Sequence, residues 1–204
     1  MNVLIINGGS DYRKLFESLG HTIVANVEDA QLAVFTGGAD VSPKLYGAEK
    51  HPFTGVDARR DIMEKTLYEA LLARKVPMVG ICRGAQFLNV MSGGAMYQHV
   101  ESHTRAHYII DQVTGETVYV SSTHHQMMKP FGIFHLIATS NNNGNREWFE
   151  GSVFKRDVAD QDIEVVFYPN TKCLCFQPHP EFDGAEYEGM KAYFRSLLNR
   201  YLEV

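Results

Sequence analysis

The stretch that decides the fold is VPMVGICRGAQFLNVMSGG, residues 76–94. Residues 76–81 form an apolar run that is too short for a helix and begins and ends with β-branched side chains, which is typical of a buried strand. From Arg83 onward the apolar residues recur at helical spacing until Gly93 and Gly94 end the pattern. Cys82 therefore lies where a strand is expected to turn directly into a helix.

A thiol at such a joint sits on a tight bend, close to the positive end of the helix dipole. This environment stabilises the thiolate, so that a nucleophile exists at neutral pH. Gly80 and Gly84 flank Cys82, and glycine permits close approach of a substrate to the backbone. The alternative is a small buried cysteine that fills a gap between strand and helix. A nucleophilic role needs a histidine from elsewhere in the chain.

The composition narrows the class of protein. The chain has 204 residues, 45% of them hydrophobic, so one well-buried core is sufficient and we expect a single domain, residues 1–204. A net charge of −5 without a cationic run argues against nucleic acid or an anionic membrane as the main partner. The chain shows neither a targeting segment nor a bilayer-spanning apolar run, and three cysteines do not suggest a disulfide framework. We expect a soluble, cytoplasmic protein.

The first half of the chain alternates between expected strands and helices. Strands are expected at 3–6, 21–25, 32–36 and 76–81, with helices at 10–19, capped by Ser10, and at 57–74. The second helix is expected to bury a face made of Met63, Leu67, Ala70 and Leu71. Repeated βα units of this kind predict an α/β fold in three layers, with a mostly parallel central sheet covered on both faces.

The second half is richer in hairpins. Strands are expected at 117–122, 133–139, 164–168 and 171–176, with a turn at 141–144 and a closing helix at 185–202. These elements add antiparallel strands to the central sheet.

Ligands in open α/β sheets bind beyond the carboxyl ends of the strands, where three segments of this chain bear candidate groups. They are Cys82, the glycine pair 37–38, and QPHPE at residues 177–181. The two prolines of QPHPE favour an extended chain, so His179 and Glu181 project to the same side and the carboxylate can orient the imidazole. Cys82, His179 and Glu181 then form a coherent catalytic triad. The alternative is a proline-rich loop with a surface histidine.

The combination of these segments resembles a known family. GICRGAQ at 80–86 looks like the nucleophile motif of the class I glutamine amidotransferase superfamily, and residues 177–181 look like its histidine and glutamate motif. Within the superfamily, the chain resembles the γ-glutamyl-γ-aminobutyrate hydrolase branch (peptidase family C26) most clearly in five motifs. They are GGADVSP at 37–43, YG at 46–47, RD at 60–61, the Cys-Arg-Gly form of the nucleophile motif, and SSTHHQ at 121–126. The resemblance implies the flavodoxin-like fold of the class I glutamine amidotransferases.

The resemblance also implies a reaction. Cys82 would attack the γ-carbonyl of a glutamine or γ-glutamyl amide to give a thioester. His179, oriented by Glu181, would protonate the leaving amine and then activate water to release glutamate. No metal or organic cofactor is required for these steps.

Further residues carry family roles by the same resemblance. Backbone N–H groups of Gly38 and Arg83 would form the oxyanion hole, while Gln86 and His125 are assigned to substrate binding. One segment departs from the family pattern: residues 141–150, NNNGNREWFE, replace the usual Asp-Gly followed by a glutamate-alanine pair. We therefore do not assume that the leaving amine is γ-aminobutyrate.

Two other groups of residues invite a functional interpretation. His99, His103 and His107 recur every four residues and would line one side of a helix as zinc ligands, but their neighbours favour a polar loop, and no metal site is predicted. Cys173 and Cys175 alternate along an expected strand, which places both in the core rather than in a redox pair.

Three functional hypotheses follow. The first is a stand-alone hydrolase of small γ-glutamyl amides, acting alone or as a homodimer. The second is a glutaminase that delivers ammonia to a partner synthetase or ligase. The third is a binding protein that retains the fold without turnover, for which Cys82 would be a buried, unreactive thiol.

Overall fold

The computed structural model describes residues 1–141, 144–158 and 161–204. Its helices are α1 (Ser10–Ser18), α2 (Ala58–Ala73), α3 (Arg83–Met91) and α4 (Glu188–Leu202). Its strands are β1 (Asn2–Ile6), β2 (Thr22–Val24), β3 (Leu32–Phe35), β4 (Met78–Ile81), β5 (Ala95–Tyr97), β6 (His99–Val100), β7 (His107–Asp111), β8 (Thr117–Val120), β9 (Met127–Lys129), β10 (His135–Ser140), β11 (Asn145–Glu150), β12 (Val153–Val158), β13 (Asp162–Tyr168) and β14 (Cys173–Phe176).

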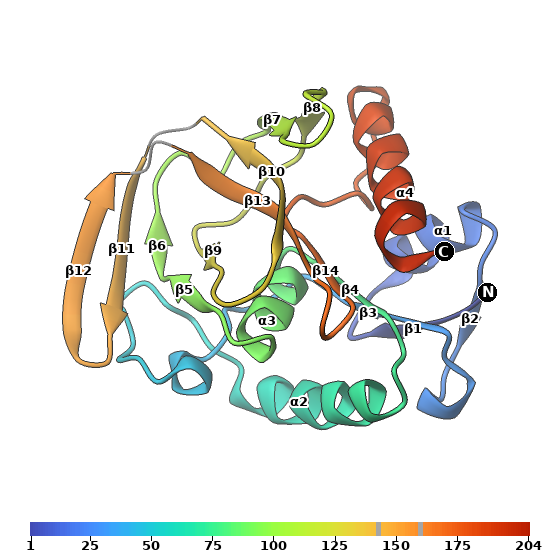
Figure 1. Cartoon of the computed structure of the whole chain (residues 1–204), viewed down its shortest axis with the longest axis horizontal. Coiled ribbons are helices and arrows are strands. Elements are labelled where there is room, and N and C mark those ends of the chain that lie inside the picture. The colour runs from blue at the N-terminus through green and yellow to red at the C-terminus, as the bar shows by residue number, and fades with distance from the viewer. Residues whose placement is uncertain (142–143, 159–160) are drawn as a thin grey trace.

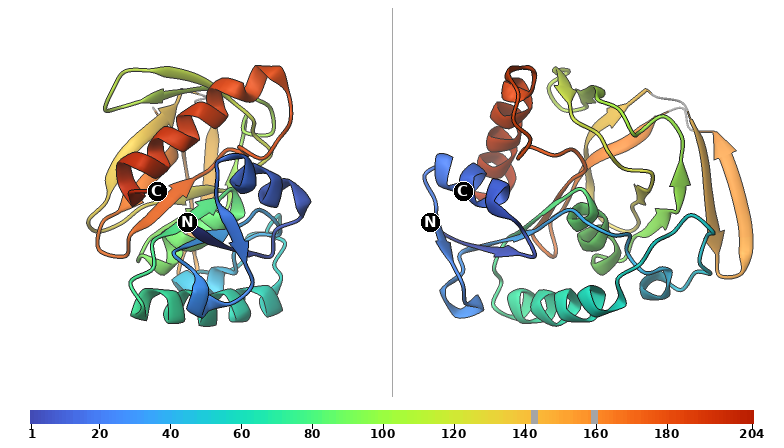
Figure 2. Two further views of the ribbon diagram at one scale, coloured as in Figure 1. Left: turned by 90° about the vertical axis from the view of Figure 1, so that its right-hand side faces the viewer. Right: turned by 180° about the vertical axis from the view of Figure 1, so that it is seen from behind.

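Within the described ranges, nine strands form the main sheet in the order β2-β1-β3-β4-β14-β13-β10-β7-β8. The strands from β2 to β14 are parallel, whereas β13, β10, β7 and β8 continue the sheet in antiparallel pairs. Helices α1 and α4 cover one face and α2 and α3 the other (Figures 1 and 2). The predicted three-layer α/β fold with antiparallel additions from the second half is confirmed. Two smaller sheets, β12-β11-β6 and β5-β9, lie beyond the main sheet (Figure 1).

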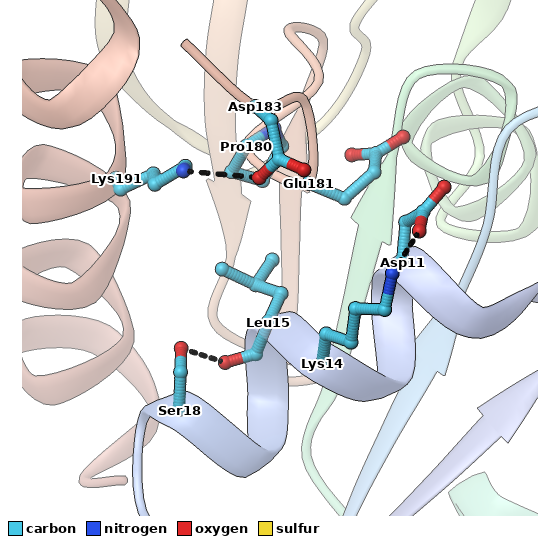
Figure 3. Close-up of a pocket in the computed structure, with 8 residues that line it drawn as sticks. All are labelled: Asp11, Lys14, Leu15, Ser18, Pro180, Glu181, Asp183 and Lys191. Atoms are coloured by element: carbon cyan, nitrogen blue, oxygen red, sulfur yellow. Dashed lines mark hydrogen bonds and ion pairs between the residues drawn. The ribbon is translucent and has the colours of Figure 1, made fainter. Parts of the chain in front are cut away.

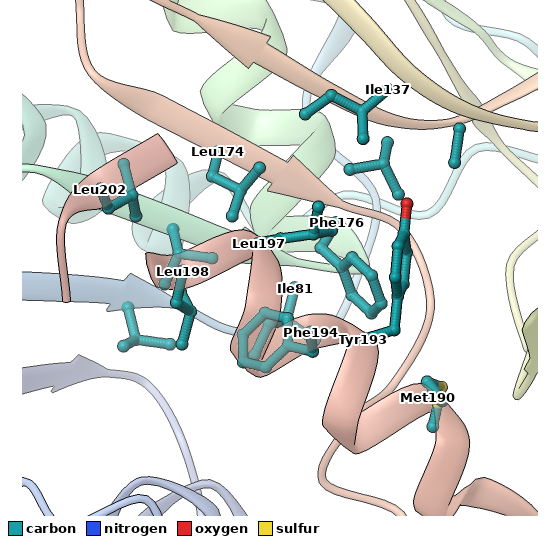
Figure 4. Packing of buried hydrophobic residues seen from close by; sticks show 14 of the residues in the cluster. Ile81, Ile137, Leu174, Phe176, Met190, Tyr193, Phe194, Leu197, Leu198 and Leu202 are labelled. Carbon is teal, nitrogen blue, oxygen red and sulfur yellow. The ribbon is translucent and has the colours of Figure 1, made fainter. Parts of the chain in front are cut away.

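Two central strands, β4 and β14, lie side by side and end at the same edge of the sheet, where Cys82 and Gln177 follow them. Helices α1 and α4 and the segment after β14 enclose a cavity of about 200 Å³ at this edge (Figure 3). Packing fixes the two strands: the Phe194 ring of α4 lies 5.0 Å from the Phe176 ring of β14, among buried leucines (Figure 4). Because each such side chain contributes about 1.5–3 kcal/mol when buried, this core holds the strand ends in register.

Of the face expected to be buried in helix α2, Leu71 is confirmed, Leu67 is half-buried, and Met63 and Ala70 are exposed. Asp61, Glu64, Tyr68 and Leu71 are buried, while Met63 is 40% exposed. Asp61 and Glu64 turn inward because both carboxylates bind the buried guanidinium of Arg83. The hydrophobic pattern does not predict this buried face correctly, because the face consists partly of charged side chains.

Several boundaries also differ from the sequence-based expectation. Gly9, not Ser10, precedes the first turn of α1, and no side chain caps it. Residues 101–106 form the expected loop, which follows the short strand β6 and precedes β7; strands β5, β6, β7, β9, β11 and β12 were not anticipated. The expected turn at 141–144 includes residues 142–143, which lie outside the described residues. Within the part of the chain that is described, no helix has the length and apolar character needed to span a membrane.

Candidate active site

Cys82 occupies a sharp elbow between β4 and α3. Its backbone angles, φ 53° and ψ −113°, are rarely adopted by residues other than glycine. The elbow is possible because its neighbours lack side chains: a Cβ at Gly80 would collide with the backbone of Gly84, and a Cβ at Gly84 with the backbone of Phe35. The predicted strand–helix joint is present, and Cys82 lines a cleft.

His179 is held in place by contacts on several sides. Its Nδ1 lies 2.7 Å from Oε1 of Glu181, and its Nε2 lies 2.9 Å from Oγ1 of Thr123. The backbone N–H of His179 donates to the hydroxyl of Ser121 at 2.9 Å, and that hydroxyl donates to the carbonyl of His179 at 3.1 Å. Phe182 stacks against the imidazole with ring centroids 4.6 Å apart. The ring orientation is therefore fixed before any substrate binds.

The charge state of His179 follows from its neighbours. Burial by itself lowers the pKa of His179, because it disfavours the charged ring. Hydrogen bonds with Cys82 and Glu181, together with the negative charge of both groups, outweigh burial and raise the pKa of His179 to about 10. The imidazole is therefore protonated at neutral pH and faces the sulfur of Cys82.

The loop after β3 is clamped by Arg60. Its guanidinium donates to the carbonyls of Thr36 and Gly37, each at 2.8 Å, and the N–H of Gly37 donates to the Tyr12 hydroxyl at 3.0 Å. Gly38 has φ +149°, and a Cβ there would collide with the Arg60 guanidinium. Only glycine therefore fits this position, and the clamp holds Gly38 at the wall of the same cleft as Cys82.

A buried ionic network supports this clamp. The guanidinium of Arg83 binds Asp61 and Glu64, and its Nε donates to the carbonyl of Ala39 at 3.1 Å. Glu64 also accepts from Nε of Arg60 at 2.7 Å. Burial and the neighbouring charge of Arg60 lower the pKa of Arg83 to about 10, which leaves its guanidinium charged at neutral pH. The network connects the start of α3 to the loop that carries Gly38.

The cleft has a volume of about 360 Å³ and brings together most of the residues predicted from the sequence. Gly38, Cys82, Arg83, Gln86, His125 and His179 all line it. Glu181 does not: it lies behind His179, in the wall of the cavity between α1 and α4 (Figure 3).

Gln86 and His125 have defined partners in the cleft wall. The amide of Gln86 donates to the carbonyl of Gln126 at 3.1 Å and to Oε1 of Gln177 at 3.2 Å. Nε2 of His125 lies 3.2 Å from Oδ2 of Asp40, and this hydrogen bond raises the pKa of His125. The cleft wall thus carries a histidine–aspartate pair.

These features agree with the comparison to protein families. Residues 17–181, most of the chain, match the model of the family Peptidase C26. The chain belongs to this family. Among its relatives is the glutamine amidotransferase-like protein YvdE of Lactococcus lactis subsp. lactis (strain IL1403), which is 33% identical over 202 residues, covering 77% of this chain and 86% of the relative.

Two further comparisons, one of sequence and one of structure, bear on this chain. The γ-glutamyl-γ-aminobutyrate hydrolase of Escherichia coli O157:H7 is 25% identical over 174 residues, covering 78% of this chain and 67% of the relative. A glutamine amidotransferase from Thermotoga maritima shares the fold, with a TM-score of 0.62 at 14% identity over 98% of this chain and 84% of that chain. The predicted family and the class I glutamine amidotransferase fold are confirmed, and the chain is an amidohydrolase.

Sequence reasoning missed several residues of this C26 site. Ser121 and Thr123, which contact His179, lie within the SSTHHQ segment, in which the sequence predicts a role for His125 alone. Asp40, the partner of His125, lies in the GGADVSP motif. Tyr12 had no sequence signal, because a lone tyrosine on an amphipathic helix predicts only packing.

Proposed function

We propose that this protein is a cysteine-dependent hydrolase of γ-glutamyl amide bonds. The observation that carries the proposal is the arrangement of His179: its Nδ1 contacts Glu181, its Nε2 contacts the Thr123 hydroxyl, and a hydrogen bond with Cys82, which lines the same cleft, helps to raise its pKa. Glu181 fixes the tautomer and orientation of the imidazole, and the raised pKa of His179 favours a thiolate–imidazolium pair.

The proposed reaction has two halves. The Cys82 thiolate adds to the γ-carbonyl carbon, and the oxyanion accepts hydrogen bonds from the N–H groups of Gly38 and Arg83. The C–N bond then breaks as His179 transfers its proton to the departing amine, which leaves a γ-glutamyl thioester. His179, now neutral, takes a proton from water; the resulting hydroxide displaces the sulfur, and glutamate and the Cys82 thiolate are released.

The walls of the cleft suit the glutamyl end of such a substrate. His125 carries positive charge when protonated, and Asp40 beside it carries negative charge. This pair complements the α-carboxylate and α-ammonium groups of a γ-glutamyl compound, while Gln86 offers an amide from the floor of the cleft. Phe53, which is 64% exposed, stands at the opening and offers an apolar surface to the leaving amine.

The second candidate is a glutaminase that delivers ammonia to a partner synthetase or ligase. The observation that favours it is the similarity to proteins named as glutamine amidotransferases. The two candidates share the chemistry at Cys82 and differ in the leaving group and in the dependence on a partner.

A substrate panel separates the two. We expect purified protein, incubated with glutamine and with a set of γ-glutamyl amines and peptides, to release glutamate from one γ-glutamyl compound much faster than from glutamine, as followed by mass spectrometry. Slow glutamine hydrolysis with no response to the panel would favour the amidotransferase. Turnover of neither class would contradict both.

A Glu181→Gln substitution should shift the pH dependence. Glu181 is one of the groups that raise the pKa of His179 to about 10, and catalysis needs the protonated ring as acid, so activity falls as pH rises through this pKa. Without the carboxylate charge, the alkaline limb of kcat/KM should move to lower pH by about one unit or more. Glutamine keeps the hydrogen bond to Nδ1, so the shift reports charge.

The matched control is Asp183→Asn, two residues further along, where the side chain is exposed. Its alkaline limb should coincide with that of the unmodified protein. An unchanged limb in Glu181→Gln would show that Glu181 does not set the charge of His179.

A further inference from the structure

A cluster of titratable side chains that the proposed reaction does not use surrounds Glu164. Strand β13 directs Asp162 and Glu164 into the interior, where both are buried. Oε1 of Glu164 lies 3.2 Å from Nδ1 of His103 and 3.0 Å from Nε2 of His107, and its Oε2 lies 3.7 Å from Nε2 of His124. Three histidines from separate segments thus converge on one buried carboxylate.

The opposite ring nitrogens of these histidines are bound to acceptors. Nε2 of His103 lies 2.8 Å from a carboxylate oxygen of Asp162, and Nδ1 of His124 lies 2.8 Å from the backbone carbonyl of Gln126. A carbonyl or carboxylate oxygen can only accept, so each of these nitrogens carries the proton. In the neutral rings, the nitrogens that face Glu164 therefore present lone pairs.

His107 repeats the same arrangement. Its Nδ1 lies 3.1 Å from the backbone carbonyl of Arg105, which leaves the lone pair of Nε2 directed at Glu164. In all three rings the tautomer is therefore set from outside the cluster, in favour of an unprotonated nitrogen inside it.

Lone pairs aimed at a carboxylate repel it unless a further ring proton or a metal ion lies between them; at His103, hydrogen bonds with Asp162 and Glu164 outweigh burial and raise the pKa to about 9, which favours such a proton where no metal is bound. Nε2 of His124 and Oε2 of Glu164 are buried and, among the described residues, have no hydrogen-bond partner. Leaving such groups unpaired costs about 1–3 kcal/mol each, and more where a charge is involved. A cation bound among these atoms removes the repulsion and satisfies them together.

We propose that this cluster is a structural Zn²⁺ site, with His103 Nδ1, His124 Nε2 and a carboxylate oxygen of Glu164 as ligands and His107 Nε2 as the fourth. The ligand atoms of the first three residues lie within 4.8 Å of one another. Zinc bonds of about 2.0–2.2 Å give tetrahedral edges of about 3.3–3.6 Å, so the most widely separated ligand atoms must draw together when the ion binds.

The chemistry of the donor set favours zinc. Imidazole nitrogens with one carboxylate suit Zn²⁺ rather than Mg²⁺ or Ca²⁺, which prefer oxygen ligands. The outer hydrogen bond from His103 to Asp162 is the carboxylate–histidine contact that orients zinc ligands in proteins. The sequence predicts a polar loop without a metal here, from the polar residues around the histidines. It does not indicate the partners His124 and Glu164, because they are distant in the chain. The equally spaced His99 lies apart from the cluster, stacked on His51.

The site would support the catalytic histidine. His124 belongs to the segment 121–126, in which Ser121 and Thr123 both bind His179. A metal that holds His124 to β13 would therefore fix the segment that positions His179. In this role the ion acts through the protein and takes no part in the reaction.

Metal analysis of tag-free protein tests the site. We expect about one zinc ion per chain, lost on dialysis against a strong chelator, with a lower Tm that added Zn²⁺ restores. Co²⁺ added to the stripped protein should give the visible absorption of a tetrahedral centre. If the stripped protein binds neither Zn²⁺ nor Co²⁺, and the chelator leaves Tm unchanged, the proposal is wrong and protons fill the cluster instead.

Variants locate the ion. His103→Gln and Glu164→Gln should abolish stoichiometric zinc binding, and Asp162→Asn should weaken it by about 10–100-fold. His135→Gln, at an exposed position on β10, should bind zinc as the unmodified protein does. Equal binding by His103→Gln would place the ion elsewhere. If the buried variants fail to fold, the titration of the unmodified protein still decides whether zinc binds.

Discussion

A Cys82→Ala protein should lose at least about 10⁴-fold in kcat/KM while its Tm stays close to that of the unmodified protein. Removal of a covalent nucleophile leaves only the contributions of substrate binding and the oxyanion hole, and in comparable triads the loss reaches the order of 10⁶. The fold should tolerate the change, because the substitution removes only the sulfur atom of a side chain that lines the cleft, and the packing lost with one atom is small. Activity is measured on the best substrate of the panel, and Tm by thermal unfolding.

The control is Cys175→Ala. Cys175 is fully buried on β14, and burial raises the pKa of its thiol far above the usual value, so it cannot serve as a nucleophile. This variant should be less stable yet keep nearly full activity at temperatures where it is folded. A substantially active Cys82→Ala enzyme would eliminate the thioester mechanism. If the unmodified protein is inactive and its Cys82 resists iodoacetamide, a binding protein without turnover is favoured instead.

The parts of the site that the sequence predicted share one property: their geometry is set locally. The strand–helix joint fixes Cys82. Glu181 contacts His179 at 2.7 Å, as the spacing predicts, but the extended chain expected there is wrong: a turn closed by the Phe182 N–H, which donates to the His179 carbonyl at 3.2 Å, brings the two side chains together. Both constraints operate within five residues, so spacing and residue type suffice to place these side chains. The central parallel strands could also be predicted from the sequence, because short buried runs rich in β-branched residues are typical of strands.

The parts that the sequence did not predict depend on contacts between distant segments. Arg60 reaches the carbonyl of Gly37, 23 residues away, and Thr123 meets His179 across 56 residues. The short strands β5, β6 and β9 likewise take their pairing from distant segments, whereas β11 and β12 form a local hairpin that the sequence analysis missed. The buried face of helix α2 was predicted incorrectly for the same reason. Asp61 faces inward because it binds Arg83, which lies 22 residues further along the chain.

An Arg83→Met substitution should destabilise the protein by about 3–5 kcal/mol, because it leaves the buried carboxylate of Asp61 without its cation and takes one of its two cations from Glu64, which keeps only Arg60. For a chain of this size the loss corresponds to a fall in Tm of about 6–20 °C. The carbonyl of Ala39 also loses its donor, so the loop that carries Gly38 should loosen and kcat should fall at temperatures where the variant remains folded.

A double-variant cycle identifies the cause. If unpaired charge dominates, Glu64→Gln should cost less in the Arg83→Met background than alone, because it then removes a charge that has already lost one of its two cations. Lys65→Met is the matched control: this lysine lies on the same helix, half exposed, 3.9 Å from Glu69, and its loss should change the free energy of unfolding by no more than about 0.5 kcal/mol. Additive effects of Arg83→Met and Glu64→Gln would instead attribute the loss to packing, and the clamp on the Gly38 loop would then rest on Arg60 alone.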